Sequence, residues 1–335
     1  MSFAIDRSMP PHLFHPTRRK ALAAIAATGL AAGLPRPARS APRARLRIGY
    51  QKSSTLLAIV KAQGHLQARL ADQGVAISWH EFANGQPLLE ALNVGAIDLS
   101  ADVADTVPLF AQAAGAALTY YARETPAPAA QAILVKEDSP IRALSDLKGR
   151  KVGFARAAGA HFLVIAALQR SGLALADIQQ AFLAPADGRA AFGNGSIDAW
   201  AIWDPFYAAT QQHERVRVLA DGRDGLADYA RYYLAATSYA EAHPAIVEQV
   251  YAALQAAGRW AKQHPDAAAA LLAPLWGLDA RIVAAANDRR SYDVRLVTGQ
   301  NLDSQQRIAD VFLANKLLPR RIVVRDARLW QPARA

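Results

Sequence analysis

The sequence predicts a two-lobed α/β protein in which each lobe is a mostly parallel β-sheet flanked by helices. The chain has 335 residues, 52% of them hydrophobic, and at roughly 150 residues per domain it is long enough to bury two cores. Short strand-like segments alternate with segments of helical periodicity, which is the pattern of sheets covered by helices on both faces. The pattern restarts after the breaker-rich Thr125-Pro126-Ala127-Pro128, so we expect one hinge crossing there and a second where the chain returns.

The elements are assigned in chain order from apolar periodicity. Before the breaker, strands are expected at 45–50, 77–82, 97–101 and 117–121, and helices at 56–60, 87–93 and 107–114. After it, strands are expected at 132–135, 151–154, 182–183, 199–203 and 216–219, with a helical turn at 144–147 and a helix at 161–171. The strand at 232–235 returns toward the first lobe, and the Ala-rich chain from Pro244 onward is helical. The predicted lobes are therefore 41–125 with 233–335, and 126–232.

The N-terminal segment has the features of an export signal. Thr17-Arg18-Arg19-Lys20 precedes an Ala/Leu run of about 14 residues, which is too short to span a hydrocarbon core of ~30 Å as a helix. Paired arginines before such a run are typical of twin-arginine export. We expect residues 1–40 to be a signal peptide cleaved near Ser40 and the mature protein to be periplasmic, the alternative being a buried N-terminal helix.

Composition and motifs exclude several classes of function. Half of the formal net charge of +10 lies in residues 1–40, and the remainder shows no dense Lys/Arg run with interleaved aromatics, so we expect no nucleic-acid partner. With no cysteine, thiolate-bound zinc, iron–sulfur clusters and a cysteine nucleophile are excluded. Gly-x-Ser-x-Gly, His-Glu-x-x-His, P-loop and Gly-x-Gly-x-x-Gly motifs are absent from the sequence. We expect no cofactor, no metal and no catalytic residue.

Ligands of open α/β sheets bind at the carboxyl ends of the strands, where this chain has the loops 51–55, 102–108, 156–161 and 203–206. Ser53-Ser54-Thr55 opens a helix, so its hydroxyls either cap that helix or face an anion together with free backbone N–H groups. His161 also lies at a helix start and is either an anion donor or a structural histidine. Trp203 and Asp204 are either a pocket wall with a polar contact, or a core aromatic with a turn carboxylate.

Five segments, in this order, carry a resemblance to a known family: RIGYQKSSTL, EALNVGAIDLS, PLFAQAAGA, DAWAIWDPF and YYLAATSYA. Over about residues 46–330 the chain resembles the aliphatic sulfonate-binding proteins of bacterial ABC importers. The resemblance implies the type II periplasmic binding-protein fold and delivery of alkanesulfonates, as a sulfur source, to a membrane permease by a monomer that is not an enzyme. Taurine- and nitrate-type binding proteins have similar architecture, so taurine or another small anion is the alternative ligand. The implied ligand contacts are Gln51, Ser53, Ser54, Thr55, Asp105, Thr106, Gly159, His161, Trp203, Asp204, Arg289 and Tyr292.

Two loops depart from the family pattern. The first carries two acids, Asp102 and Asp105, and the loop 156–160 lacks a hydroxyl. A carboxylate that faces a sulfonate repels it. The acids are therefore expected either to enter hydrogen bonds within the protein or to meet the cationic group of a zwitterionic sulfonate. The competing class of function is an enzyme on the same fold, with Asp204 and His161 as acid and base.

Overall fold

The computed structural model describes residues 44–332, which belong to one unit formed by residues 41–335. The predicted signal peptide and its cleavage near Ser40 lie outside the described residues.

The first sheet has the strand order β12-β5-β11-β3-β1-β2, with β4 paired to β11 and β13 to β5. Its strands are β1 (Ala44–Gln51), β2 (Val75–Phe82), β3 (Leu99–Ser100), β4 (Val103–Ala104), β5 (Leu118–Glu124), β11 (Arg231–Ala236), β12 (Val294–Arg295) and β13 (Arg328–Leu329). β1 is parallel to β2 from Ala44↔Val75 to Gln51↔Phe82. Because β1 alternates apolar and polar residues, Leu46 and Ile48 are fully buried.

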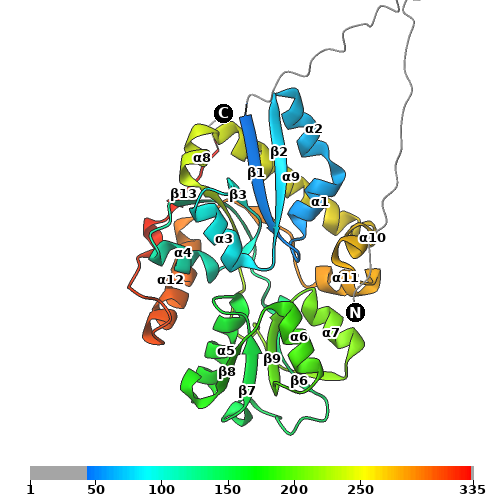
Figure 1. Cartoon of the computed structure of the whole chain (residues 1–335), viewed down its shortest axis with the longest axis vertical. Helices are drawn as coiled ribbons and strands as arrows, with labels where there is room; N and C mark the ends of the chain where they lie inside the picture. Colours follow the sequence, from blue (N-terminus) through cyan, green and yellow to red (C-terminus); the bar gives the residue numbers. More distant parts are fainter. Residues whose placement is uncertain (1–43, 333–335) are drawn as a thin grey trace, which may run out of the picture. The chain divides into compact units, whose positions relative to one another are not determined.

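Helices of the first half and of the C-terminal third accompany this sheet (Figure 1). They are α1 (Leu56–Gln63), α2 (His65–Asp72), α3 (Gly85–Asn93), α4 (Val107–Ala113), α8 (Thr237–Ala242), α9 (Pro244–Gln263), α10 (Pro265–Trp276), α11 (Ala280–Asp288) and α12 (Gly299–Ala314). In α3 the spacing of Leu88, Leu89 and Leu92 places all three in the core.

The second sheet has the order β10-β6-β9-β7-β8 and is drawn in green tones in Figure 1. Its strands are β6 (Gln131–Lys136), β7 (Lys151–Phe154), β8 (Gln179–Phe182), β9 (Ala199–Trp203) and β10 (Val216–Asp221). The helices α5 (Gly159–Arg170), α6 (Pro185–Gly193) and α7 (Phe206–His213) pack around it. Phe154, Phe192 and Trp200 are fully buried in its core.

The predicted fold class is confirmed with one correction: both sheets are mixed rather than mostly parallel. β6 is antiparallel to β9 and to β10, and β11 is antiparallel to β3 and to β5. β6 and β11 are the strands that follow the two passages between the sheets. A strand that enters a sheet directly needs no crossover helix, and it can therefore pair antiparallel. Apolar alternation does not encode strand direction.

Within residues 44–332 no helix alone meets the length and hydropathy of a membrane span; α10 and α11 meet them only together, as a pair bent by 117°.

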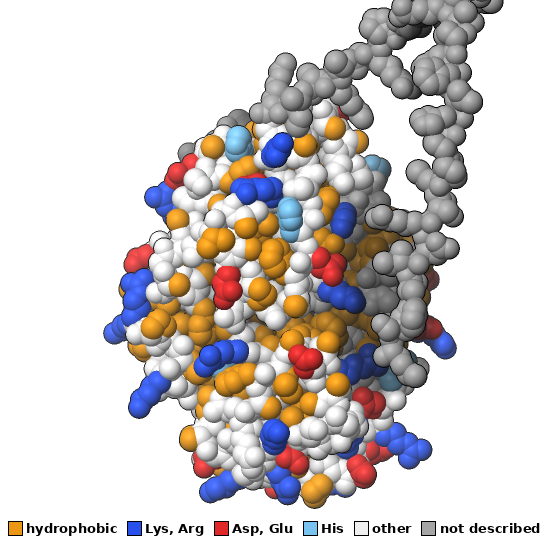
Figure 2. Space-filling model, in the orientation of Figure 1, with side chains coloured by type: hydrophobic (Ala, Val, Ile, Leu, Met, Phe, Trp, Pro, Cys, Tyr) orange, Lys and Arg blue, Asp and Glu red, His pale blue; other side chains and the backbone are white. Residues whose placement is uncertain are grey.

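On the face shown in Figure 2, basic and acidic side chains are interspersed and form no single basic patch.

Candidate functional site

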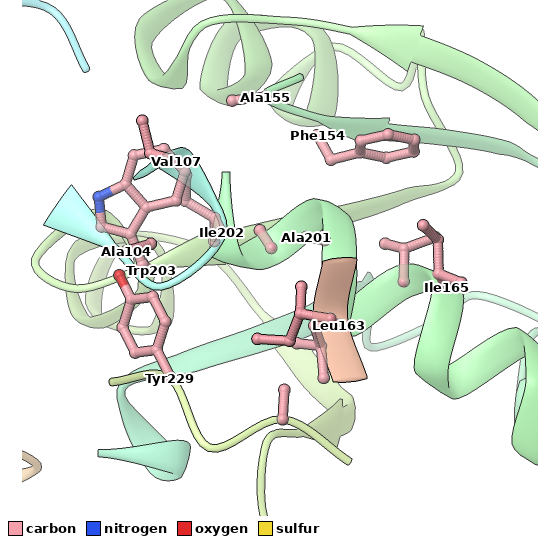
Figure 3. Packing of buried hydrophobic residues seen from close by; sticks show 14 of the residues in the cluster. Ala104, Val107, Phe154, Ala155, Leu163, Ile165, Ala201, Ile202, Trp203 and Tyr229 are labelled. Carbon is pink, nitrogen blue, oxygen red and sulfur yellow. The ribbon is translucent and has the colours of Figure 1, made fainter. Parts of the chain in front are cut away.

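A cavity of about 20 Å³ lies between residues of the two sheets. It has room for about one water-sized group. Each of the four loops expected at a ligand site contributes to it, and so does the start of α3. The lining residues are Gln51, Asn84, Gly85, Gln86, Ala104, Val107, Arg156, Ala158, Gly159, Trp203, Tyr229 and Arg231. Figure 3 shows four of them, Ala104, Val107, Trp203 and Tyr229, gathered together.

One wall is the N-terminus of the nine-residue helix α3. The Asn84 side chain caps this helix by accepting a hydrogen bond from the Gln86 N–H at 3.1 Å. Gly85 allows close packing, because a Cβ there would lie 3.1 Å from Val103 Cγ1 and 3.2 Å from Val107 Cγ2. A helix N-terminus carries partial positive charge and free N–H donors, so this wall favours an anion.

Two arginines also line the cavity, and no Asp or Glu is among the described residues that do so. Arg156 is exposed, and its guanidinium lies 4.9 Å from the Phe182 ring centroid. Arg231 is only 3% exposed and lies 5.4 Å from the Tyr229 ring centroid. The charged groups of this wall are therefore cationic.

Arg231 belongs to a buried cluster of four charges, with Asp102, Glu124 and Arg290. Asp102 Oδ2 lies 2.8 Å from Arg231 Nε and 3.3 Å from Arg290 Nη2. Arg290 Nη2 donates to Glu124 Oε2 at 2.5 Å, and the Tyr233 hydroxyl donates to Glu124 Oε1 at 2.6 Å. Buried charges are tolerated when they are paired and hydrogen-bonded, and here two carboxylates neutralise two guanidinium groups.

Trp203 presents an unused donor at the cavity. The residue is 4% exposed, and its indole Nε1–H has no acceptor among the described residues. A buried donor without an acceptor is unfavourable, and a ligand oxygen in the cavity would relieve this cost.

Two polar contacts join loops that belong to different sheets. The Thr106 hydroxyl, before α4, donates to the Ala157 carbonyl at 2.6 Å. Arg289, at the end of α11, donates from Nη1 to both carboxylate oxygens of Asp204 at 2.8 and 2.9 Å and from Nη2 to Gln211 at 2.6 Å. Burial raises the pKa of Asp204 to about 6, although the charge of Arg289 opposes this shift.

Residues 70–268 match the model of the family described as NMT1/THI5 like. An aliphatic sulfonates-binding protein of Escherichia coli K12 is 44% identical over 296 residues, which are 88% of this chain and 91% of that protein. The alkanesulfonate-binding protein SsuA of Xanthomonas axonopodis pv. citri, solved bound to MOPS, superposes with a TM-score of 0.80 at 40% identity, covering 85% of this chain and 97% of that one.

The chain belongs to the aliphatic sulfonate-binding protein family. The homologues reported above are substrate-binding proteins of ABC transporters and not enzymes. The desulfurization enzyme DszB has a TM-score of 0.62 at 18% identity, covering 85% of this chain and 96% of that one. At that identity the likeness shows a common fold alone.

In this family member, the hydroxyls of Ser54 and Thr55 in the first loop are used within the protein. Ser54 Oγ accepts a hydrogen bond from the Gln51 N–H at 3.1 Å. Thr55 Oγ1 accepts from the Tyr292 hydroxyl and from Arg290 Nη1, both at 3.3 Å, and makes no capping bond to α1. Of the two alternatives for this loop, helix capping by Thr55 is therefore wrong. Tyr292 is buried. Ser53 is also buried.

His161 has the geometry of a structural histidine. Its ring stacks on Phe154 with centroids 4.8 Å apart, and Nδ1 accepts a hydrogen bond from the Ala157 N–H at 3.3 Å. Burial, together with the charge of Arg156, lowers the pKa of His161 to about 4. The ring is not among the described residues that line the cavity, and its Nδ1 is already engaged by the Ala157 N–H, so this position does not favour the acid or base role of the enzyme alternative.

The two acids of the second loop are engaged by the protein, which favours the first of the two arrangements expected for them. Asp105 Oδ2 accepts a hydrogen bond from the Ala230 N–H at 3.1 Å, and burial raises the pKa of Asp105 to about 7. Asp102 lies in the charge cluster. Neither is among the described residues that line the cavity, so nothing in the lining matches the cation of a zwitterion.

Sequence reasoning missed several lining residues: Asn84, Gly85, Gln86, Tyr229 and Arg231. For the first three a signal exists, because Asn84 follows a predicted strand and precedes a predicted helix, as the recognised loops 51–55, 102–108 and 156–161 do. For Arg231 there is no local signal, since its partner Asp102 is distant in the sequence.

Proposed function

We propose that this chain is the substrate-binding component of an ABC importer and binds aliphatic sulfonates in the cavity described above. The observation that carries the proposal is a lining with two arginines, a helix N-terminus and no carboxylate among the described residues. A sulfonate spreads one negative charge over three oxygens, so several N–H donors at one wall suit it. The donors available are the α3 N-terminus, Arg231, Arg156 and the Trp203 indole.

The organic part of the ligand is assigned to the apolar side of the cavity. Ala104, Val107, Tyr229 and Trp203 form that side (Figure 3). Because the cavity is small, binding of even a short alkanesulfonate needs its walls to separate. We propose that the lobes 41–125 with 233–335, and 126–232, rotate about the crossings near 122–130 and 230–236.

We propose that the earlier candidate residues fall into two groups. Gln51, Gly159 and Trp203 line the cavity and contact the ligand. The others hold those contacts in place: Ser53, Ser54, Thr55 and Tyr292 in the first loop, Asp105 and Thr106 in the second, and His161, Asp204 and Arg289 across the site.

The cellular role follows from the same proposal. Residues 1–40 are proposed to direct twin-arginine export and to be cleaved near Ser40. The mature monomer would deliver sulfonates in the periplasm to a permease for sulfur supply. It needs no nucleic-acid partner.

The test is calorimetric titration with ethanesulfonate and with ethyl methyl sulfone, a neutral molecule of similar shape. We expect the sulfonate to bind and the sulfone to bind at least ~10-fold more weakly, because one hydrogen bond to a charged group contributes about 1.5–3 kcal/mol. Arg231→Gln should weaken sulfonate binding. The matched control is Arg217→Gln, since Arg217 donates to the carbonyls of Glu137 and Ile141 away from the cavity. Equal affinities for sulfonate and sulfone would refute the proposal.

A further inference from the structure

A buried carboxylate stands directly behind the arginine of the cavity. Asp102 is fully buried, and its Oδ2 lies 2.8 Å from Arg231 Nε. This contact lies outside hydrogen-bond geometry, so it is chiefly an attraction between charges. Arg231 lines the cavity, whereas Asp102 does not. Asp102 therefore acts on a ligand through Arg231.

The loop that carries Asp102 is fixed in place from the cavity side. Gln51, which also lines the cavity, donates from Nε2 to the Asp102 carbonyl. Arg290 Nη2 donates to Asp102 Oδ2, the carboxylate oxygen that also faces Arg231, at 3.3 Å. Asp102 Oδ1 has no partner among the described residues. Among those residues, Arg231 and Arg290 are therefore the groups that neutralise the charge of this carboxylate.

The charges near the cavity can be counted from these contacts. Within the cluster, Asp102 and Glu124 cancel Arg231 and Arg290. The other charged residue among the described lining is Arg156, which is exposed to solvent. Together with the partial charge of the α3 N-terminus, about one positive charge remains for the ligand. A singly charged anion is then balanced, whereas a doubly charged one keeps an uncompensated charge in a buried site, which is costly.

We propose that Asp102 makes this site selective for singly charged anions, so that it admits sulfonates and rejects doubly ionised phosphonates of the same shape. The inference rests on the proposed function and names its substrate class by charge. Removal of the carboxylate charge leaves Arg231 uncompensated and gives the site one positive charge more. The rejected dianion then becomes the better partner.

The experiment compares ethanesulfonate with ethylphosphonate in calorimetric titrations at two pH values. Ethylphosphonate carries one charge at the acidic value and two at the alkaline value, whereas ethanesulfonate carries one at both. In the wild type we expect similar affinities at acidic pH and at least ~10-fold weaker phosphonate binding at alkaline pH, equivalent to about 1.4 kcal/mol. Asp105 and Asp204 also ionise in this range, and they do so in the wild type and in an Asp102 variant alike, so the contribution of Asp102 is obtained by comparing the two proteins at the alkaline pH.

The variant Asp102→Asn should raise the phosphonate-to-sulfonate affinity ratio at alkaline pH by at least ~10-fold. If that variant does not fold, Glu124→Gln raises the net charge of the same cluster by one and should move the ratio in the same direction, by less. The matched control is Asp98→Asn, which removes a buried carboxylate paired with Arg47 at 2.5 Å outside the cluster, and should leave the ratio unchanged.

Three outcomes overturn the inference: a wild type that binds the dianion as tightly as the sulfonate, an Asp102→Asn ratio equal to that of the wild type, or an Asp98→Asn ratio that shifts as much. Failure of the proposed function is a different result, because ethanesulfonate would then not bind the wild type at either pH.

Discussion

The substitution Gly159→Ala tests whether the cavity wall is as tightly packed as the structure indicates. Gly159 begins α5 and lines the cavity. A Cβ at this position would lie 2.6 Å from Tyr229 Cε2, 2.7 Å from Tyr229 Cδ2 and 3.2 Å from Gln131 Oε1. Carbon atoms in contact prefer about 3.5–4.0 Å, so the Tyr229 ring must move by roughly 1 Å.

The ring has little freedom to move. Tyr229 is 2% exposed and stands against the Arg231 guanidinium. Overpacking of this kind costs roughly 1–3 kcal/mol. Because the displaced ring also lines the cavity, we expect the free energy of unfolding to fall by about that amount and sulfonate affinity to fall by at least ~10-fold. Urea denaturation and calorimetric titration with ethanesulfonate measure the two effects.

Gly153→Ala, in the neighbouring strand β7, is the matched control. Its Cβ would meet the end of the Ile197 side chain, which can rotate away, and Gly153 is not among the cavity residues. We expect a smaller loss of stability and unchanged affinity. An alanine at 159 that binds ethanesulfonate as tightly as the wild type would refute the assignment of Gly159 and Tyr229 to the ligand site.

Three further predictions concern groups that hold the site in place. Burial raises the pKa of Asp105 to about 7, so its contribution to stability is present at acidic pH and is lost as the pH rises through 7. The free energy of unfolding of Asp105→Asn, measured by urea denaturation, should therefore increase relative to that of the wild type between pH 5 and pH 8. The same difference between the two proteins at both pH values would contradict this. Burial lowers the pKa of His161 to about 4, so its contribution to stability is present above its ordinary pKa of about 6.5 and is lost as the pH falls toward 4. His161→Leu should therefore reduce the fall of the free energy of unfolding at acidic pH. An unchanged slope would be evidence against a neutral ring. Arg289→Gln leaves Asp204 without its ion pair and should increase the rate of ligand dissociation measured by stopped flow. Adding Asp204→Asn to the same chain should reverse part of that increase. If the effects of the two substitutions on the dissociation rate are additive, a direct coupling of the two residues is contradicted.

Much of the fold could be predicted because its periodicity is local. The strands at 151–154 and 199–203 and the turn at 144–147 have the predicted bounds. The helices α6 and α7 were missed, since α6 contains Gly188 and Gly193 and α7 follows Pro205, which weaken the helical signal. Strand direction was also missed, because it depends on how the chain passes between the sheets.

The site could be predicted at the level of loops and only in part at the level of atoms. Four loops were recognised from the rule that ligands bind at strand ends, and each contributes to the cavity. Which way a hydroxyl points is set by long-range partners, as for Thr55 and Tyr292. Arg231 was not predicted as a lining residue, because nothing in its local sequence distinguishes it from the other residues of that strand.

The second passage between the sheets carries both the cavity arginine and the contacts that fix the loop 102–108. Asp105 exchanges hydrogen bonds with Ala230 in both directions, since its N–H donates to the Ala230 carbonyl at 3.0 Å and its carboxylate accepts from the Ala230 N–H at 3.1 Å. The next residue, Arg231, pairs with Asp102 of the same loop. Gln305 of α12 then holds the Asp105 carbonyl at 2.7 Å. Since Arg231 both lines the cavity and begins the strand by which the chain re-enters the first sheet, a force that an anion exerts on its guanidinium acts on the passage itself. If the proposed rotation of the lobes takes place, we expect Arg231 to be the residue through which a bound anion acts on it.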